Sequence, residues 1–267
     1  MDKNSSILIK EKSEKGVLRL TMNDLACKNA LSNKMLSALL DEIKNASIDK
    51  SIRVIVLRAN GKVFSAGHDL KEIKEARINS DEGKIFFQEL FNLCSSLMQL
   101  IINVPQPVIA EVDGIATAAG CQLVASCDLA ISSQESKFAT PGVNIGLFCS
   151  TPMVALSRNV GKKHAMQMLL TGDLISAKKA KEIGLINDVV SKNELGPAVR
   201  ELAEKIASKS SMTIETGKKA FYAQSEMGLS EAYKYTSKVM TENLIQHDAK
   251  EGIDAFIEKR SPNWKDE

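Results

Sequence analysis

The chain has 267 residues, of which 44% are hydrophobic and 25% are charged, and its formal net charge is +2. This is the composition of a globular protein with a sizeable core, and it fits either one large domain with a helical appendage or two small domains. Acidic and basic residues are mixed along the chain, which excludes a nucleic-acid-binding arm, and no apolar run approaches the ~18 residues that a membrane span requires.

The first two thirds of the chain alternate between strand and helix patterns. Short apolar runs predict strands, and apolar residues at helical spacing predict helices. In chain order the predicted elements are strands at 7–10 and 16–22, a helix capped by Ser32 and running through Ile43, a strand at 52–57, a turn at 61–67, a helix from about Asp69, a long helix at 83–102, a strand at 108–112, a short helix at 117–125 and a strand at 128–131.

A loop at 141–152 separates this alternation from a mainly helical remainder. The predicted elements there are helices near 153–158, 162–170 and 176–183, a strand at 186–190, and helices from Glu194 onward. Alternating strands and helices followed by helices alone indicate an α/β core with a helical C-terminal subdomain. We therefore predict a core over residues 1–195 and a helical subdomain over residues 196–267.

The segment from Gly114 to Asp128 carries the strongest functional signal. Small residues at 116–120 leave backbone N–H groups uncovered where a helix is predicted to begin. Such N–H groups attract an oxyanion, because the helix dipole places partial positive charge there. The nearby Gln122 is neutral and takes no proton at pH 7. The segment therefore predicts a site that polarises a carbonyl but lacks a carboxylate beside it.

A second segment, from Phe64 to Leu70, predicts another set of exposed N–H groups. Gly67 allows a sharp turn, and Asp69 is suited to cap the helix that follows. The turn exposes the N–H of His68, whose imidazole is also a candidate acid or base. By itself this pattern fits a turn without any function equally well.

The five cysteines and three histidines show no spacing typical of a metal site. The odd number of cysteines and the lack of an apolar signal region near Met1 favour a reducing compartment. We predict the cytoplasm, with the mitochondrial matrix as the alternative if a leader precedes Met1. The thiols are expected to pack in the interior rather than to react.

Together the two segments resemble the crotonase (enoyl-CoA hydratase/isomerase) superfamily. The pattern is small-x-Ala-Gly-x-Asp-Leu, followed about fifty residues later by Gly-x-Ala-x-Ala-Ala-Gly-Cys-x-Leu-x-x-x-Cys-Asp. The resemblance covers nearly the whole chain, including residues 28–31, 138–141 and 251–260. It implies a β-β-α spiral core that binds an acyl-CoA thioester. Coenzyme A then enters as part of the substrate, and no covalently bound cofactor is expected.

The resemblance also implies which residues contact the substrate. The thioester oxygen is expected between the backbone N–H groups of His68 and Ala119, each of which contributes on the order of 3 kcal/mol to an enolate-like state. Backbone contacts with the adenine and lysine contacts with the phosphates complete the expected site. The residues expected to contact coenzyme A are Lys28, Lys62, Ala66, His68, Asp69, Leu70 and Lys259.

Two glutamates that hydratases of this family use are replaced in this chain. Their positions match Gln122 and Gly142. Because each general acid or base contributes about 100- to 10,000-fold, hydration of crotonyl-CoA is expected to be weak or absent. Gly142 is expected to leave room for a different acyl group or an extra water. Restoring both carboxylates, Gln122→Glu with Gly142→Glu, is expected to raise hydration at least about 100-fold.

Five polar residues are candidates to replace the glutamates, although capping or packing explains them as well: His68, Asn144, Cys149, Ser150 and Thr151. Three functions remain open. The first is an enoyl-CoA hydratase or isomerase that stabilises a thioester enolate, and the second is a decarboxylase or isomerase with a different acid or base. The third is a protein that binds acyl-CoA without turnover. RNA binding is the weakest hypothesis, since the lysine pairs are brief and interrupted by apolar residues.

Apolar residues in the helical third predict an oligomer. A small subdomain cannot cover Tyr233, Tyr235, Met240, Leu244 and Ile245, and such surface marks an interface. With the resemblance, this predicts a homotrimer or a hexamer of two trimers. Neither a nucleic acid partner nor a membrane span is expected.

Overall fold

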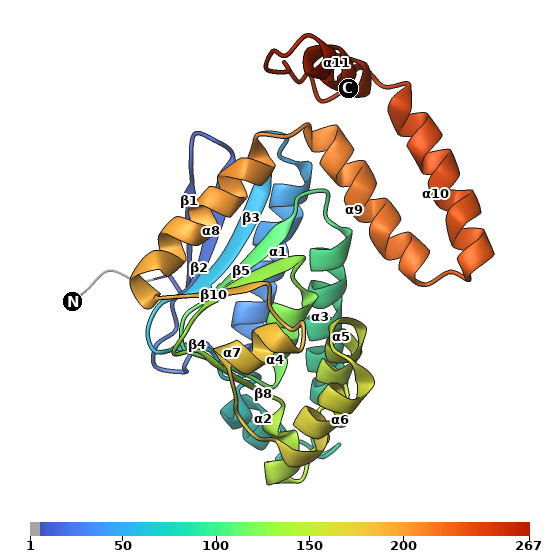
Figure 1. The fold of residues 1–267 in the computed structure, drawn as a ribbon. Coiled ribbons are helices and arrows are strands. Elements are labelled where there is room, and N and C mark those ends of the chain that lie inside the picture. Colours follow the sequence, from blue (N-terminus) through green and yellow to red (C-terminus); the bar gives the residue numbers. More distant parts are fainter. Residues whose placement is uncertain (1–5) are drawn as a thin grey trace.

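The computed structural model describes residues 6–267, and its strands form two sheets (Figure 1). The larger sheet has the order β1-β2-β3-β5-β7-β10 and the smaller sheet the order β4-β6-β8-β9. Neighbouring strands are parallel except for the pairs β1–β2 and β8–β9. The strands are β1 Leu8–Lys12, β2 Val17–Met22, β3 Val54–Ala59, β4 Val63–Ser65, β5 Val108–Val112, β6 Ile115–Thr117, β7 Leu129–Ser133, β8 Lys137–Ala139, β9 Ile175–Ser176 and β10 Asp188–Val190. Residues 1–5, on which the leader prediction partly depends, lie outside the described residues.

The chain visits the two sheets in turn. Strands β3, β5 and β7 enter the larger sheet, and each is followed directly by β4, β6 or β8 in the smaller sheet. Helices then return the chain to the larger sheet. This repeated path confirms the predicted α/β class and its β-β-α spiral.

Helices account for most of the remaining chain. They are α1 Asn33–Ile48, α2 Leu70–Ala76, α3 Lys84–Asn103, α4 Ala119–Ser126, the 3-10 helix η1 Pro141–Ile145, α5 Pro152–Asn159, α6 Lys162–Thr171, α7 Ala177–Glu182, α8 Lys192–Ala207, α9 Ser211–Ser225, α10 Leu229–Leu244 and α11 His247–Ile257. Two predicted caps are confirmed: the Ser32 side chain accepts from Met35 N–H, and the Asp69 side chain accepts from Lys71 N–H. These caps fix where α1 and α2 begin.

The short strands β4, β6 and β8 are not among the predicted elements, and β4 lies inside the stretch expected to be a turn. Each has three residues, which is too short to show a period of two. They become strands because they pair with one another, with Ile115 opposite Val63 and Lys137 opposite Ile115. Pairing between distant segments therefore creates the sheet that sequence patterns miss.

The larger sheet buries both faces. Successive side chains of a strand point to opposite faces of the sheet. On one face, residues such as Leu20, Ile55 and Leu57 form a core with α1, α3 and α4. Residues of the opposite face, including Val54 and Val56, pack against α8. The boundary predicted between residues 195 and 196 falls within α8, and most of α8 covers this sheet.

Helix α9 is fixed to the core by a buried ion pair. Lys218 Nζ donates to Asp128 Oδ2 at 2.7 Å and to the carbonyl oxygens of Ile101 at 2.8 Å and Gln106 at 2.9 Å. Tyr222 Oη donates to the other Asp128 oxygen at 2.9 Å. Burial lowers the pKa of Lys218, and the neighbouring Asp128 opposes that shift. Asp128 therefore has a structural role, because it joins α9 to the core.

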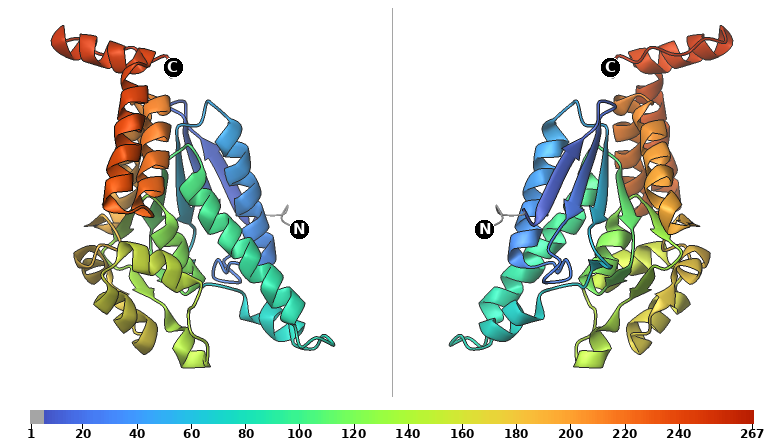
Figure 2. Two further views of the ribbon diagram at one scale, coloured as in Figure 1. Left: turned by 90° about the vertical axis from the view of Figure 1, so that its right-hand side faces the viewer. Right: turned by 90° about the vertical axis from the view of Figure 1, so that its left-hand side faces the viewer.

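The last two helices form an arm, defined here as α10 and α11, that extends away from the sheets (Figures 1 and 2). Helix α10 runs beside α9 and has no buried residue. Several apolar side chains of the arm are exposed, with Ile245 at 79% and Phe256 at 85%. An isolated chain therefore leaves this apolar surface uncovered.

Helix α3 is the one helix among residues 6–267 that is long and apolar enough to cross a membrane by length and composition. It packs against α1 and α4, and Leu90, Cys94 and Leu97 are buried in the core. Those contacts are typical of a core helix.

Candidate active site

Three segments that carry candidate site residues follow neighbouring parallel strands of the smaller sheet. Residues 66–69 follow β4, residues 118–119 follow β6, and residues 140–142 follow β8. Because parallel strands end at the same edge of a sheet, these segments lie together. Two hydrogen bonds join them: Thr117 Oγ1 donates to Ala66 O at 3.3 Å, and Ala118 N–H donates to Ala139 O at 3.0 Å.

Gly67 brings the two expected N–H donors into one place. Its φ is +87°, and a Cβ on it would lie 2.8 Å from Ala118 Cβ and 3.2 Å from Ala119 N. Any other residue at 67 would therefore push the two segments apart. His68 N–H and Ala119 N–H find no acceptor among residues 6–267. Since Ala119 is the first residue of α4, its N–H also carries the positive end of the helix dipole.

The turn before α4 is held in an unusual conformation. Ala118 has φ +51° and ψ −120°, a region that residues with a Cβ rarely occupy. Gly120 supports it, because a Cβ there would lie 2.4 Å from Ser65 O. Close packing of β4 on α4 thus keeps the strained turn that aims the Ala119 N–H outward from the helix start.

Gln122 lies one helical turn beyond this point and is almost fully buried, with 5% of its surface exposed. Its backbone N–H donates to Ala118 O at 3.0 Å. The side-chain Oε1 is buried and accepts no hydrogen bond from residues 6–267. A buried acceptor of this kind needs a donor from a ligand or water.

The space beside Gly142 is occupied by residues of the loop that follows it. No room for a ligand group is therefore left at this position by residues 6–267. A Cβ on Gly142 would lie 2.5 Å from Leu147 O and 2.9 Å from Cys149 Sγ. The Gly142 N–H donates to Cys149 Sγ at 3.3 Å, and burial raises the pKa of this thiol. The expectation that Gly142 leaves space was wrong. The proposed Gly142→Glu graft requires the backbone at Leu147 to move.

The His68 imidazole packs inward. Its Nδ1 lies 3.1 Å from Leu31 O, and its ring meets Phe91 edge-on at 5.4 Å between centroids. Because a carbonyl only accepts, Nδ1 carries the proton and Nε2 carries a lone pair. That Nε2 is buried without a partner among residues 6–267, and burial lowers the pKa of His68. The side chain is therefore neutral at pH 7.

The other candidate acid–base residues differ in exposure. Cys149 is buried against Gly142. Asn144 and Ser150 are exposed, and the Ser150 hydroxyl donates to Phe148 O. Thr151 precedes α5 and makes no side-chain cap. Of these four, Cys149 alone lies where the second glutamate is expected.

The segment expected to bind coenzyme A is built from two stretches held together by backbone bonds. Ala66 N–H donates to Lys28 O at 3.2 Å, and Leu31 N–H donates to Gly67 O at 2.7 Å. Lys28 and Leu70 are exposed beside this junction, and Lys62 is exposed just before β4 begins. The Asp69 carboxylate caps α2.

Lys259 is not brought to this junction within one chain. It lies two residues beyond the end of α11, and α11 lies at the opposite end of the molecule from α2 and β8 (Figure 1). The sequence predicted that Lys259 lies with Lys28 and Lys62. Within one chain, Lys259 lies far from them.

The structure adds one residue that the sequence did not single out. Thr140, between β8 and Gly142, is 1% exposed, and its Oγ1 is buried without a partner among residues 6–267. Its only sequence signal is its place in the Phe-Ala-Thr-Pro stretch.

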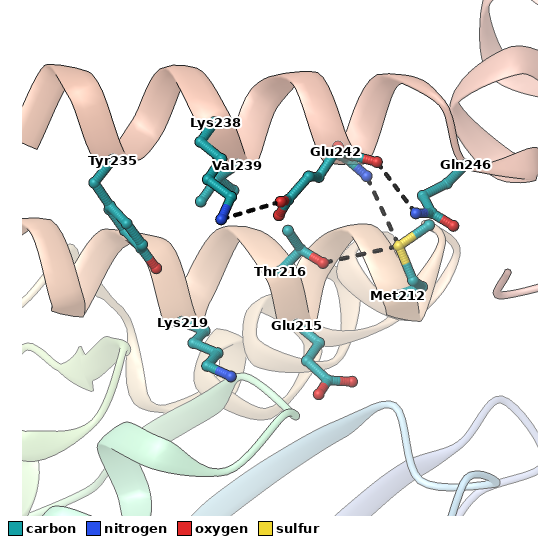
Figure 3. Close-up of a pocket in the computed structure, with 10 residues that line it drawn as sticks. Met212, Glu215, Thr216, Lys219, Tyr235, Lys238, Val239, Glu242 and Gln246 are labelled. Carbon is teal, nitrogen blue, oxygen red and sulfur yellow. Dashed lines mark hydrogen bonds and ion pairs between the residues drawn. The ribbon is translucent and has the colours of Figure 1, made fainter.

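A hollow of about 400 Å³ lies elsewhere, between α9 and α10 (Figure 3). Lys219, Lys238 and Glu242 are among the side chains that line it, and Lys238 pairs with Glu242 inside it. These exposed charges form no acid–base or nucleophilic arrangement. The hollow belongs to the uncovered surface of the arm.

Known proteins are similar to this chain over nearly its whole length, including the candidate site. Residues 12–267 match the family described as enoyl-CoA hydratase/isomerase. A Xenopus laevis relative, enoyl-CoA hydratase domain-containing protein 3, mitochondrial, is 48% identical over 251 residues, which cover 94% of this chain and 84% of the relative. An enoyl-CoA hydratase structure from Mycobacterium smegmatis has a TM-score of 0.93 at 45% identity. The match covers 97% of this chain and 99% of the chain in that structure. The structure of human enoyl coenzyme A hydratase domain-containing protein 3 has a TM-score of 0.92 at 44% identity. This match covers 97% of the present chain and 100% of the human chain.

Proposed function

The chain belongs to the enoyl-CoA hydratase/isomerase family, and on this premise we propose that it binds an acyl-CoA thioester at the ends of β4, β6 and β8. The thioester oxygen lies between His68 N–H and Ala119 N–H. The observation that carries this proposal is the contact of Gly67 with Ala118 and Ala119, which juxtaposes two segments with free N–H donors. Lys28 is exposed beside the same site, Lys62 is exposed just before β4, and both are suited to the phosphates of coenzyme A.

The proposed chemistry is stabilisation of a thioester enolate with little proton transfer. Two N–H donors at an oxyanion contribute on the order of 3 kcal/mol each. The two positions where the family places glutamates hold Gln122 and Gly142. We therefore expect slow hydration of crotonyl-CoA. Isomerisation or decarboxylation with another acid or base, and binding without turnover, are the alternatives.

One experiment tests both parts of this proposal. Calorimetry measures binding of free CoA and crotonyl-CoA, and absorbance measures hydration by the wild type, by Gln122→Glu and by Gln122→Met. We expect binding by all three proteins and slow hydration by the wild type and Gln122→Met. Gln122→Glu should raise hydration about tenfold or more, short of the ~100-fold of a well-supported group.

Two outcomes would contradict the proposal. If neither CoA nor crotonyl-CoA binds, the thioester site is wrong. If the wild type hydrates crotonyl-CoA rapidly, the site contains an acid or base that the lost glutamates do not reveal, and alanine variants of His68 and Cys149 would identify it.

The proposed assembly is a homotrimer or a hexamer of two trimers. The uncovered apolar surface of α10 and α11 supports an interface, and the position of Lys259 supports a shared site. In this arrangement Lys259 meets the coenzyme A phosphates of a neighbouring copy.

The mitochondrial matrix is the compartment we favour for this chain. The Xenopus laevis relative carries the word mitochondrial in its name. The cytoplasm predicted from the cysteines is equally reducing, so the thiols do not separate the two compartments.

A further inference from the structure

The last ten residues, 258–267, form a tail that folds back onto the start of α11. Asp248, the second residue of α11, is 1% exposed, and its two carboxylate oxygens accept from Lys265 N–H at 2.8 Å and Asp266 N–H at 2.9 Å. The Asp248 N–H donates to Glu267 O at 3.0 Å. Because a buried carboxylate has to be hydrogen-bonded, these bonds close the tail against α11.

The turn that carries Lys259 is fixed by Glu251 of α11. The Glu251 carboxylate accepts from Asn263 N–H at 2.7 Å and pairs with both Nη atoms of Arg260, at 2.6 and 2.9 Å. A bidentate pair of this kind fixes orientation as well as distance. Lys259 has φ +56°, a conformation that residues with a Cβ rarely adopt and that surrounding contacts must maintain. The tail therefore gives Lys259 a defined place relative to α11.

The other end of the tail is bonded to the core. The Asp266 carboxylate accepts from Arg53 Nη1 at 2.9 Å and from Ser211 N–H at 2.7 Å. Trp264 Nε1 donates to Ser208 O at 3.0 Å. Arg53 is itself anchored, because its Nε donates to the carbonyl of the last residue of α8 at 2.7 Å. The tail thus connects α11 to the residue before β3 and to the turn between α8 and α9.

Little apolar packing holds α11 in its place within one chain. It follows α10 after Ile245 and Gln246, and its buried residues are Asp248 and Ala255. Phe256 is 85% exposed. Because burial of apolar surface is the main stabilising contribution in folding, α11 without the tail would be free to swing about its link to α10. The polar bonds of the tail oppose this motion.

We propose that the tail is a strap that presents Lys259 to a neighbouring copy, and that Asp266 is a positioning residue for coenzyme A binding. A lysine that is already held in place loses less conformational freedom when it meets a phosphate, so the affinity is higher. This inference rests on the proposed function, in which Lys259 meets the coenzyme A phosphates.

A double-mutant cycle on the affinity for free CoA, measured by calorimetry, tests the strap. Asp266→Ala removes the bonds to Arg53 and Ser211 and should weaken CoA binding about two- to tenfold, the range for ordering one long side chain. Lys259→Ala should weaken binding at least as much. Adding Asp266→Ala to Lys259→Ala should have no further effect, because no lysine is left to position.

Two other variants serve as controls. Asp254→Ala removes the same charge from α11, and the Asp254 side chain makes no hydrogen bond or ion pair among residues 6–267, so CoA affinity should not change. Asp266→Asn keeps an oxygen that accepts from Ser211 and should weaken binding less than Asp266→Ala. Urea unfolding checks that each variant is folded, and light scattering should give the same number of chains for all of them.

The outcomes separate this inference from the proposed function. If the wild type does not bind CoA, the proposed function fails. If the wild type binds CoA and either single variant, Asp266→Ala or Lys259→Ala, binds it equally well, the strap alone is overturned. Additive losses in the double variant would also overturn it, since the effect of Asp266 would then not pass through Lys259. Fewer chains in the Asp266→Ala assembly would assign the tail to assembly instead of positioning, which overturns the inference as well.

Discussion

Single residues decide what chemistry this site retains. The N–H donors of His68 and Ala119 depend on backbone position, so a side-chain change leaves them in place. The proposed loss of the two glutamates depends on side chains instead, because glutamine has the shape of glutamate without its charge. Gly142 preserves neither, and Cys149 Sγ and Leu147 O occupy the space beside it.

A prediction at this scale concerns that space. Gly142→Ala should lower the free energy of unfolding by about 1–3 kcal/mol, because its Cβ meets a backbone oxygen that cannot rotate away. Gly217→Ala is the control: it lies inside α9 with nothing within 4 Å of the added Cβ. Gly217→Ala should raise the free energy of unfolding by about 0.5–1 kcal/mol, because alanine has a higher helix propensity than glycine. Urea unfolding measures both, and equal effects of the two substitutions would refute the steric reason.

At the scale of elements, three short strands position the site and one ion pair positions α9. Strands β4, β6 and β8 are too short to be predicted singly, yet their pairing aligns the segments that carry the candidate site. Helix α9 depends on Lys218, whose side chain is 7% exposed and whose three N–H groups all have acceptors.

Lys218→Met should therefore destabilise the protein by about 3–5 kcal/mol, since it leaves the Asp128 carboxylate buried without its cation. Lys219→Met, at the neighbouring exposed position, should change stability by less than about 0.5 kcal/mol. Urea denaturation followed by circular dichroism measures the difference. Similar stabilities of the two variants would show that the ion pair does not hold α9.

At the scale of the whole molecule, the single chain leaves apolar surface uncovered. The arm leaves Ile245 and Phe256 exposed and holds Lys259 far from Lys28 and Lys62. The proposed assembly would cover the apolar surface of the arm, because apolar surface of this kind marks an interface.

Light scattering should accordingly give three or six chains of 29.1 kDa for the wild type. Leu244→Lys with Ile245→Lys should shift the protein toward monomers, because burying two ammonium groups in an interface is costly. Ile78→Lys, an equally apolar and exposed site after α2, should leave the assembly intact. A wild-type monomer at micromolar concentration would refute the proposed assembly.

The sequence by itself determined the family, the α/β class, the caps Ser32 and Asp69, and the two segments whose N–H groups find no acceptor among residues 6–267. It also shows Gln122 and Gly142 at the positions where the family resemblance places glutamates. These are local properties, carried by residue identity at fixed spacing, so no contact is needed to recognise them. The tertiary structure alone decided that position 142 has no room, that the Thr140 hydroxyl is buried without a partner among residues 6–267, and that Lys259 is remote. Each of these depends on which distant segments meet, and spacing along the chain does not specify that.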